Sequence, residues 1–250
     1  MVCGYIAHIS TPGRSSASVL STVVGISAVH LFNRMTDPTK DPDVRIAMKR
    51  MYRILGRVTK QAYGIRQETL NLLLAAAGDF LRGLRDAALL QLAYDTLCRH
   101  SELITLRIDH LVTTPHGIEI RHSILLRKSK VDQAAQGRWL PLRPRTVAAI
   151  RQWMNAAKIN EGLILRGVNR HGAVTKSLCN GQIGRIYKRI AKQAKLDPEL
   201  IARISGHSFR VGAAQDLLAS GASMPTIMHR GRWTKSDTVM RYLEKFESIK

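Results

Sequence analysis

The chain carries the sequence ISGHSFRVGAA at residues 204–214. His207 and Arg210 are three residues apart in this stretch, so both side chains lie on one face of a helix that Ser205 is placed to cap. That face lies at the amino-terminal end of the helix, where unpaired backbone N–H groups favour an anion. A histidine and an arginine at this spacing are a weak signal by themselves, and their meaning depends on what accompanies them.

Two other groups of polar and aromatic residues accompany this pair. Arg99 follows an apolar stretch that also holds Tyr94, and Glu102 comes three residues after it. Near the carboxyl end, Trp233 and Tyr242 are nine residues apart. The presence of all three groups in one chain favours a functional site over a chance pair.

The composition indicates a folded and strongly basic protein. Of the 250 residues, 39 are Lys or Arg and 18 are Asp or Glu, which gives a net charge of +21. The hydrophobic content of 45% is enough for a packed core, so the chain is not a disordered basic tail. A surface with this charge attracts polyanions, nucleic acids above all.

The sequence gives no indication of a membrane protein, a secreted protein or a metal-binding protein. The longest purely apolar run, residues 72–77, is far shorter than the roughly 20 residues of a spanning helix, and no signal peptide is predicted. Cys3, Cys98 and Cys179 are odd in number and form no C-x-x-C pair, which favours a reducing cytoplasm. The common metal and phosphate-loop motifs are absent, so we expect no metal site and no cofactor.

A basic helix is predicted to begin at Asp41-Pro42, because aspartate caps free N–H groups and proline suits the first helical position. Its apolar residues recur at three- and four-residue steps from Val44 to Val58. Its other faces carry one acid, Asp43, and six cations: Arg45, Lys49, Arg50, Arg53, Arg57 and Lys60. A solvated face normally mixes charges of both signs, so we favour contact with a phosphate backbone; a merely solvated face is the alternative.

The remaining pattern predicts a mostly helical (α+β) chain with one small antiparallel sheet. Helical periodicity covers residues 17–32, 68–77, 84–97, 146–159, 182–195, 208–220, 225–229 and 236–246. In the first of these helices the core-facing residues are expected to be Leu20, Val23, Val24, Ala28 and Leu31. A turn is predicted at 113–117, strands at 118–120, 124–126 and 138–142, and a loop at 128–137. The apolar pattern lapses near Gly64, which predicts one domain over residues 1–60 and another over 64–250.

Three segments resemble the tyrosine recombinases, also called the phage integrase family. CRHSEL at 98–103 resembles the family's first-arginine box, and SGHSFRVGAA at 205–214 resembles its H-x-x-R box. GRWT at 231–234, followed by VMRY at 239–242, resembles the terminal nucleophile box, with tryptophan where histidine is more usual. The resemblance covers roughly residues 41–246. It implies the tyrosine recombinase catalytic fold, preceded by a partial helical DNA-binding domain.

The resemblance implies a site-specific enzyme that breaks and rejoins DNA strands without metal or ATP. In the family a tyrosine attacks a backbone phosphate, forms a 3′-phosphotyrosyl link and releases a 5′-hydroxyl, and this role falls to Tyr242. The attack builds negative charge on the phosphate oxygens, which guanidinium groups stabilise with paired N–H donors. Arg99 and Arg210 are the candidates for this clamp. His207 is the candidate that accepts or relays the phenol proton.

The general acid, Trp233 and Glu102 each have more than one interpretation. The leaving 5′ oxygen needs a general acid, which the family supplies from a lysine in a β-hairpin turn. Lys130 is the first candidate and Lys128 the second, and a lysine that only contacts phosphate is the alternative. Trp233 can donate its indole N–H to a phosphate oxygen, or simply pack in the core. Glu102 is expected to hold a cation in place, with an ordinary helix charge as the alternative.

Double-stranded DNA is the implied partner, and a homotetramer on DNA is the implied assembly. Residues 1–60 are short for the family's amino-terminal domain, and only residues 243–250 follow Tyr242, where related proteins add a helix that docks on a neighbouring subunit. We expect a cytoplasmic, nucleoid-associated protein of a bacterium, phage or plasmid. A type IB topoisomerase-like enzyme that relaxes supercoils, and a truncated DNA-binding remnant without catalysis, are the alternatives.

Overall fold

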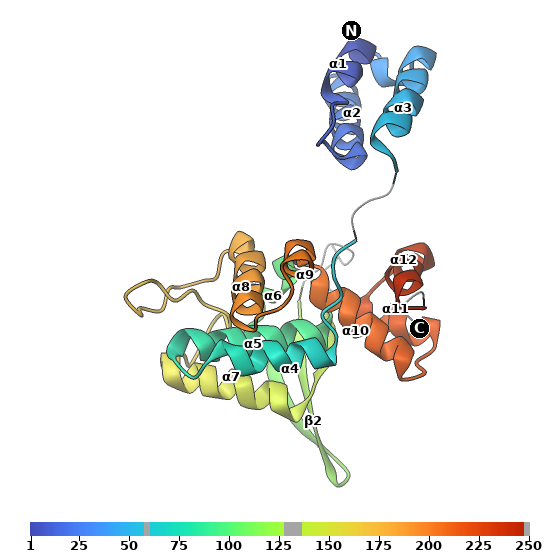
Figure 1. Cartoon of the computed structure of the whole chain (residues 1–250). Coiled ribbons are helices and arrows are strands. Elements are labelled where there is room, and N and C mark those ends of the chain that lie inside the picture. Colours follow the sequence, from blue (N-terminus) through green and yellow to red (C-terminus); the bar gives the residue numbers. More distant parts are fainter. Residues whose placement is uncertain (58–60, 128–136, 248–250) are drawn as a thin grey trace. The chain divides into compact units, whose positions relative to one another are not determined.

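The structure is a computed structural model that describes residues 1–57, 61–127 and 137–247. The chain divides into two compact units, residues 1–60 and 61–250, each with its own apolar core (Figure 1). The first unit packs three helices around Ile6, Val19 and Met51. Its elements are α1 (Val2–Ile9), α2 (Ser16–Phe32), the 3-10 turn η1 (Pro38–Lys40) and α3 (Pro42–Leu55).

Helix α3 begins as the sequence predicts. The Asp41 side chain accepts a hydrogen bond from the Asp43 N–H at 2.8 Å, and Pro42 occupies the first helical position. The buried residues of α3, Val44 and Met51, belong to the predicted apolar stripe. The helix ends at Leu55, because Gly56 follows with a positive φ of 72°, which glycine adopts readily and which does not continue the helix.

The buried face of α2 differs from the predicted one. Val23 is buried as expected, and Val19 is buried as well. The other four predicted residues, Leu20, Val24, Ala28 and Leu31, are exposed. Apolar residues lie on nearly every side of this helix, so periodicity gives no single face. The contacts of α2 with α1 and α3 select the buried side.

The second unit combines helices with one small sheet, and the mostly helical fold with a small antiparallel sheet is confirmed. Helix α5 lies at its centre, where it contacts α4, α7 and α10 (Figure 1). The short helices α6 and α9 were not predicted. The helices of this unit are α4 (Gln67–Ala77), α5 (Leu81–Thr96), α6 (His100–Leu103), α7 (Pro144–Ala157), α8 (Asn180–Gln193), α9 (Pro198–Arg203), α10 (Ser208–Ala219), α11 (Met224–Gly231) and α12 (Ser236–Glu247), with the 3-10 turn η2 (Ile108–His110).

The sheet has the order β1-β2-β3, with both pairs of neighbours antiparallel. Its strands are β1 (Leu111–His116), β2 (Glu119–Leu126) and β3 (Arg138–Leu142). The prediction of a turn at 113–117 is wrong in part, because most of that segment pairs with β2 as strand β1. Pro115 is compatible with this pairing since β1 is an edge strand, which tolerates a residue without an N–H. The turn itself is at Gly117, whose φ is 61°.

The segment that opens the second unit lies directly against α10. The Ile65 N–H donates to the Ser208 carbonyl at 2.9 Å. A Cβ atom added at Gly212, one turn further along α10, would lie 2.0 Å from the Ile65 carbonyl oxygen. Glycine at 212 therefore permits a backbone contact that no other residue allows, and this contact places the start of α10 close to the chain after residue 60.

We expect Gly212→Ala to lower the free energy of unfolding by about 1–3 kcal/mol, because the added methyl group must push two backbone segments apart. Gly184→Ala is the matched control: Gly184 lies inside α8 with no atom within 4 Å of an added Cβ. That change should raise stability by about 0.5–1 kcal/mol. Urea unfolding of both variants measures the difference. Equal stability of Gly212→Ala and the unmodified protein would contradict the close contact with Ile65.

Candidate active site

Five of the six predicted catalytic residues line one pocket of about 180 Å³. The five are Arg99, His207, Arg210, Trp233 and Tyr242. They come from four places in the second unit: the turn after α5, the start of α10, the turn after α11, and α12. The sixth, Lys130, lies outside the described residues, as does its alternative Lys128.

Arg210 is almost completely buried, with a relative exposure of 2%. Its Nη1 donates to the Leu97 carbonyl at 2.6 Å, and its Nη2 donates to the Gly231 carbonyl. Leu97 caps the end of α5 and Gly231 ends α11, so the guanidinium lies at the carboxyl ends of two helices, whose partial negative charge favours a cation. Burial, together with the positive charges of Arg99 and Arg232, lowers the pKa of Arg210 to about 10. The group is therefore charged at neutral pH.

Glu102 is a buried carboxylate that binds two arginines. It accepts from the Arg99 N–H at 3.0 Å and from Arg99 Nη1 at 2.8 Å. Arg232 Nη2 donates to the same carboxylate at 2.9 Å. Burial alone would raise the pKa of Glu102, but Arg232 and the hydrogen bonds from Arg99 outweigh it and hold the pKa below its ordinary value. These contacts are those expected of a carboxylate that holds cations in place.

The cap residue of α10 is His207 and not Ser205 as predicted, because the Ser205 hydroxyl accepts from the His207 N–H at 3.2 Å, just before the helix begins. His207 lines the pocket. Its ring meets the edge of the His100 ring, with 6.0 Å between the ring centroids. Partial desolvation lowers the pKa of His207, and the nearby charges of His100, Arg210 and Arg99 lower it further. Since the ordinary value is about 6.5, the imidazole is neutral at pH 7 and able to accept a proton.

Trp233 connects Arg210 to Tyr242. The Arg210 guanidinium lies 4.3 Å from the centre of the Trp233 ring, and the Tyr242 ring meets the indole edge with 5.9 Å between centroids. Two glutamines anchor the backbone beside the phenol: Gln215 Nε2 donates to the Tyr242 carbonyl at 3.0 Å, and Gln61 Nε2 donates to the Arg241 carbonyl at 2.5 Å. Among the described residues, neither the Tyr242 hydroxyl nor the indole N–H of Trp233 has a hydrogen-bond partner, so both are available to a ligand.

Comparison with known proteins identifies the family of this chain. The model of the phage integrase family matches residues 64–248. The chain belongs to this family. Two curated relatives extend the similarity over 98% of the chain. One is an integrase/recombinase, the XerD homolog of Selenomonas ruminantium, which is 31% identical over 255 residues and of which 72% is covered. The other is the Cre recombinase of Escherichia phage P1, which is 26% identical over 261 residues and of which 75% is covered.

The fold of this tyrosine recombinase recurs in solved structures of the family. The integrase of the Tn1549 transposon, in complex with transposon right end DNA, matches with a TM-score of 0.63 at 13% identity. The match covers 96% of this chain and 79% of that one. At this identity the likeness concerns the fold alone. Membership of the family gives the coarse function, that of a site-specific recombinase.

The pocket of the recombinase also holds residues that were not predicted. Arg232, Thr234, Lys235 and Thr238 line it. Arg232 and Thr234 flank Trp233 in the terminal box, so their place in the sequence was a signal. The burial of Arg232 was not predictable, because arginine is mostly exposed in proteins. Lys235 is the lysine among the described residues that line this pocket.

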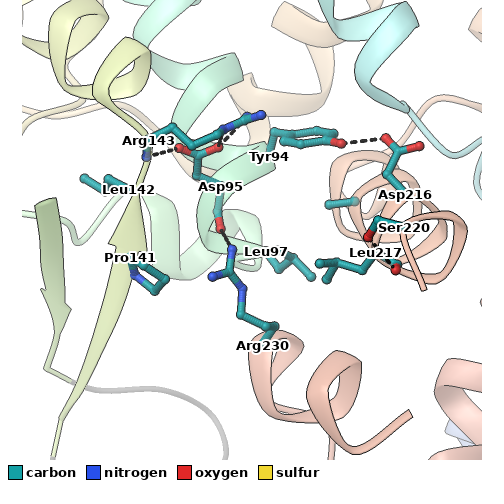
Figure 2. Close-up of a pocket in the computed structure, with 11 residues that line it drawn as sticks. Tyr94, Asp95, Leu97, Pro141, Leu142, Arg143, Asp216, Leu217, Ser220 and Arg230 are labelled. Atoms are coloured by element: carbon teal, nitrogen blue, oxygen red, sulfur yellow. Dashed lines mark hydrogen bonds and ion pairs between the residues drawn. The ribbon is translucent and has the colours of Figure 1, made fainter. Parts of the chain in front are cut away.

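A second cavity, of about 310 Å³, lies among the carboxyl end of α5, the end of β3, α10 and α11 (Figure 2). Its polar groups bind one another: the Tyr94 hydroxyl donates to Asp216 at 2.5 Å, and the Arg143 N–H donates to Asp95 at 2.8 Å. Arg230 reaches the Asp95 carbonyl at 3.5 Å. Because these groups belong to elements that also carry the active-site pocket, their pairing holds the end of α5 in place.

Five of the predicted DNA-binding residues of the recombinase lie on α3 and just after it, in the first unit, whereas Lys60 and Lys128 lie outside the described residues. Arg45, Lys49 and Arg53 follow one another at four-residue steps, and all three are exposed. Arg50 is exposed as well, and the Arg57 guanidinium lies 4.5 Å from the centre of the Tyr52 ring. Across residues 1–57, 61–127 and 137–247, none of these five cations forms an ion pair with an acid, so their charge is uncompensated.

The described part of the chain holds neither a metal-binding cluster nor a membrane-spanning helix. No three His, Cys, Asp or Glu side chains there are grouped so that they could bind a metal ion. Nor does that part contain a helix with the length and apolar character needed to span a bilayer.

Proposed function

We propose that this recombinase cleaves and rejoins duplex DNA through a 3′-phosphotyrosyl link on Tyr242, without metal or ATP. The observation that carries the proposal is the convergence of one phenol, one neutral imidazole, one indole and three guanidiniums, two of them predicted, on a single pocket. A phosphodiester bound in this pocket would contact both the nucleophile and the groups that stabilise the transition state. Positioning and electrostatic stabilisation are the main demands of phosphoryl transfer.

Each group of the pocket has a role in the proposed reaction. The Tyr242 oxygen attacks the phosphorus while its proton passes to His207, whose lowered pKa leaves the imidazole neutral. Arg99 and Arg210 bind the non-bridging oxygens, and Trp233 donates its indole N–H to one of them. The bond to the 5′ oxygen breaks, and that oxygen leaves with a proton from a general acid. Lys130 remains our first candidate for the acid and Lys128 the second.

Trapping on a nicked suicide substrate tests the proposal. Cleavage next to the nick releases a short 5′-hydroxyl strand, which diffuses away and leaves the protein attached to DNA. We expect an adduct that forms in the presence of a metal chelator and without ATP, and that maps to Tyr242. Salt-sensitive binding without an adduct would instead indicate a DNA-binding remnant. Relaxation of a plasmid that does not depend on paired sites would favour a topoisomerase-like activity.

Double-stranded DNA is the partner that we propose, with a homotetramer as the working assembly. The net charge of +21 and the uncompensated cations of α3 support a DNA partner. The relatives named as recombinases, and the Tn1549 integrase bound to transposon DNA, support it as well. We propose that the protein acts on the nucleoid in the cytoplasm, where such DNA is found.

Removal of three cations from α3 should weaken DNA binding and reduce its dependence on salt. Each lost phosphate contact lowers the slope of log K against log salt by about 0.9, so Arg45→Ala/Lys49→Ala/Arg53→Ala should reduce the slope by up to about 3. Arg14→Ala removes an exposed cation of the same unit outside α3 and should leave the slope unchanged. Fluorescence anisotropy between 50 and 200 mM salt is the measurement. An unchanged slope in the triple variant would exclude α3 from the DNA interface.

A further inference from the structure

Arg232 is a third guanidinium at the active-site pocket, in a position that is unusual for arginine. It caps the end of α11 with a φ of 56°, in the left-handed region that glycine adopts most easily. Its side chain is buried, with a relative exposure of 6%. A buried charge is costly unless it is paired. Both the backbone and the burial therefore disfavour arginine here, and its contacts must compensate.

The contacts of Arg232 lead to both arginines that we place on the phosphate. Its Nη2 donates to Glu102 at 2.9 Å, and Glu102 also binds Arg99. The same Nη2 lies 3.3 Å from the Leu97 carbonyl, which accepts from Arg210 as well. Arg232 thus shares one acceptor with Arg99 and another with Arg210.

The shared carboxylate decides how Arg99 presents its donors. Arg99 uses Nη1 for Glu102 Oε1, while Oε2 is held by the Arg99 backbone N–H and by Arg232. Without Arg232, Glu102 would be free to take the Arg99 guanidinium in a two-pronged pair, which is the geometry that arginine and carboxylate prefer. That pair would engage a second N–H group of Arg99, which lines the pocket.

We propose that Arg232 is a positioning residue of the active site, which orients Arg99 through Glu102 and Arg210 through the Leu97 carbonyl. The inference rests on the proposed function. Arg232 acts through these neighbours because its terminal nitrogens are engaged by Thr96, Leu97 and Glu102, and its Nε is shielded from solvent. A purely structural anchor between α11 and α5 is the competing explanation.

Single-turnover cleavage of the suicide substrate at saturating DNA tests the inference. Arg232→Gly suits the left-handed backbone, and we expect its cleavage rate to fall about 100-fold, as for a misplaced catalytic group, with DNA affinity within about threefold. Added guanidinium ion should restore part of this rate and leave the unmodified protein unaffected. Arg232→Lys should recover little, because an ammonium group cannot reproduce the planar fork. If Arg232 only anchors α11 to α5, its variants should be less stable, but they should show neither the slower cleavage nor the rescue by guanidinium ion.

A double-mutant cycle with Glu102→Gln tests the route through the carboxylate. If Arg232 acts through Glu102, Arg232→Gly/Glu102→Gln should be no slower than the slower single variant. Rate losses that multiply would overturn that route, and a rate for both Arg232 variants equal to that of the unmodified protein would overturn the inference altogether. If Arg232→Gly does not fold, Arg232→Lys in the same cycle decides. Failure of the unmodified protein to form an adduct overturns the proposed function, and the role of Arg232 with it.

Discussion

Tyr242→Phe should bind DNA as tightly as the unmodified protein and form no covalent adduct with it. The substitution removes one oxygen atom and keeps the ring that packs against Trp233, whose centroid is 5.9 Å away. The backbone anchor from Gln215 to the Tyr242 carbonyl is also kept. Loss of a covalent nucleophile typically costs at least about 10⁴-fold in rate, so adduct formation on a suicide substrate should fall below detection.

Tyr187→Phe is the matched control for this experiment. Tyr187 is fully buried against Phe209, and its hydroxyl has no hydrogen-bond partner within the described residues. Loss of that hydroxyl should leave cleavage unchanged and leave stability equal or slightly higher, because an unpaired polar group no longer has to be buried. An adduct formed by Tyr242→Phe at the normal rate, or one mapped to another tyrosine, would overturn the assignment of the nucleophile.

Arg210→Lys should reduce the cleavage rate by about 10³-fold while DNA affinity changes only a few-fold. Removal of a single donor to a developing oxyanion costs about 10²–10³-fold, and lysine loses the paired donors of the guanidinium. Lysine also leaves the carbonyls of Leu97 and Gly231 without their present donors. Each unpaired buried carbonyl costs about 1–3 kcal/mol, so thermal unfolding should show a less stable protein.

Arg85→Lys separates these two effects. Arg85 is buried like Arg210 and pairs with Asp86 at 2.6 Å, but it does not line the active-site pocket. We expect this variant to lose stability without a slower rate of cleavage per folded molecule. If Arg210→Lys behaves in the same way as Arg85→Lys, then Arg210 is a structural arginine and has no place in the transition state.

The sequence predicts most helices of this fold because their periodicity is long and one-sided. Helix α3 is the clearest case, with a capping aspartate, a proline and one apolar stripe. The buried face of α2 was predicted wrongly because its apolar residues surround the helix, so that tertiary contacts make the choice. Strand β1 was predicted as a turn because its residues are typical of turns. An edge strand tolerates Pro115, and most of β1 is exposed, so the usual apolar pattern of a strand is absent.

The candidate site follows from the sequence only where short boxes of residues mark it. The boxes contain five of the side chains that line the pocket. These side chains lie between residues 99 and 242 of the sequence, and the fold brings them together. Arg232 escapes prediction because its burial depends on acceptors that lie far away in the sequence, at the end of α5. A local sequence pattern cannot predict a contact between residues that are so far apart in the sequence.

The sharing of Glu102 has an energetic consequence for the protein without DNA. Arg99, Arg210 and Arg232 bring three positive charges to one negative carboxylate, so two positive charges remain uncompensated in a small and poorly solvated volume. Their mutual repulsion costs free energy in the protein without DNA. We expect an anion that enters the pocket to relieve this repulsion, so inorganic phosphate or sulfate should stabilise the native state by mass action. We expect the negative charge of a bound DNA backbone to relieve this repulsion in the same way.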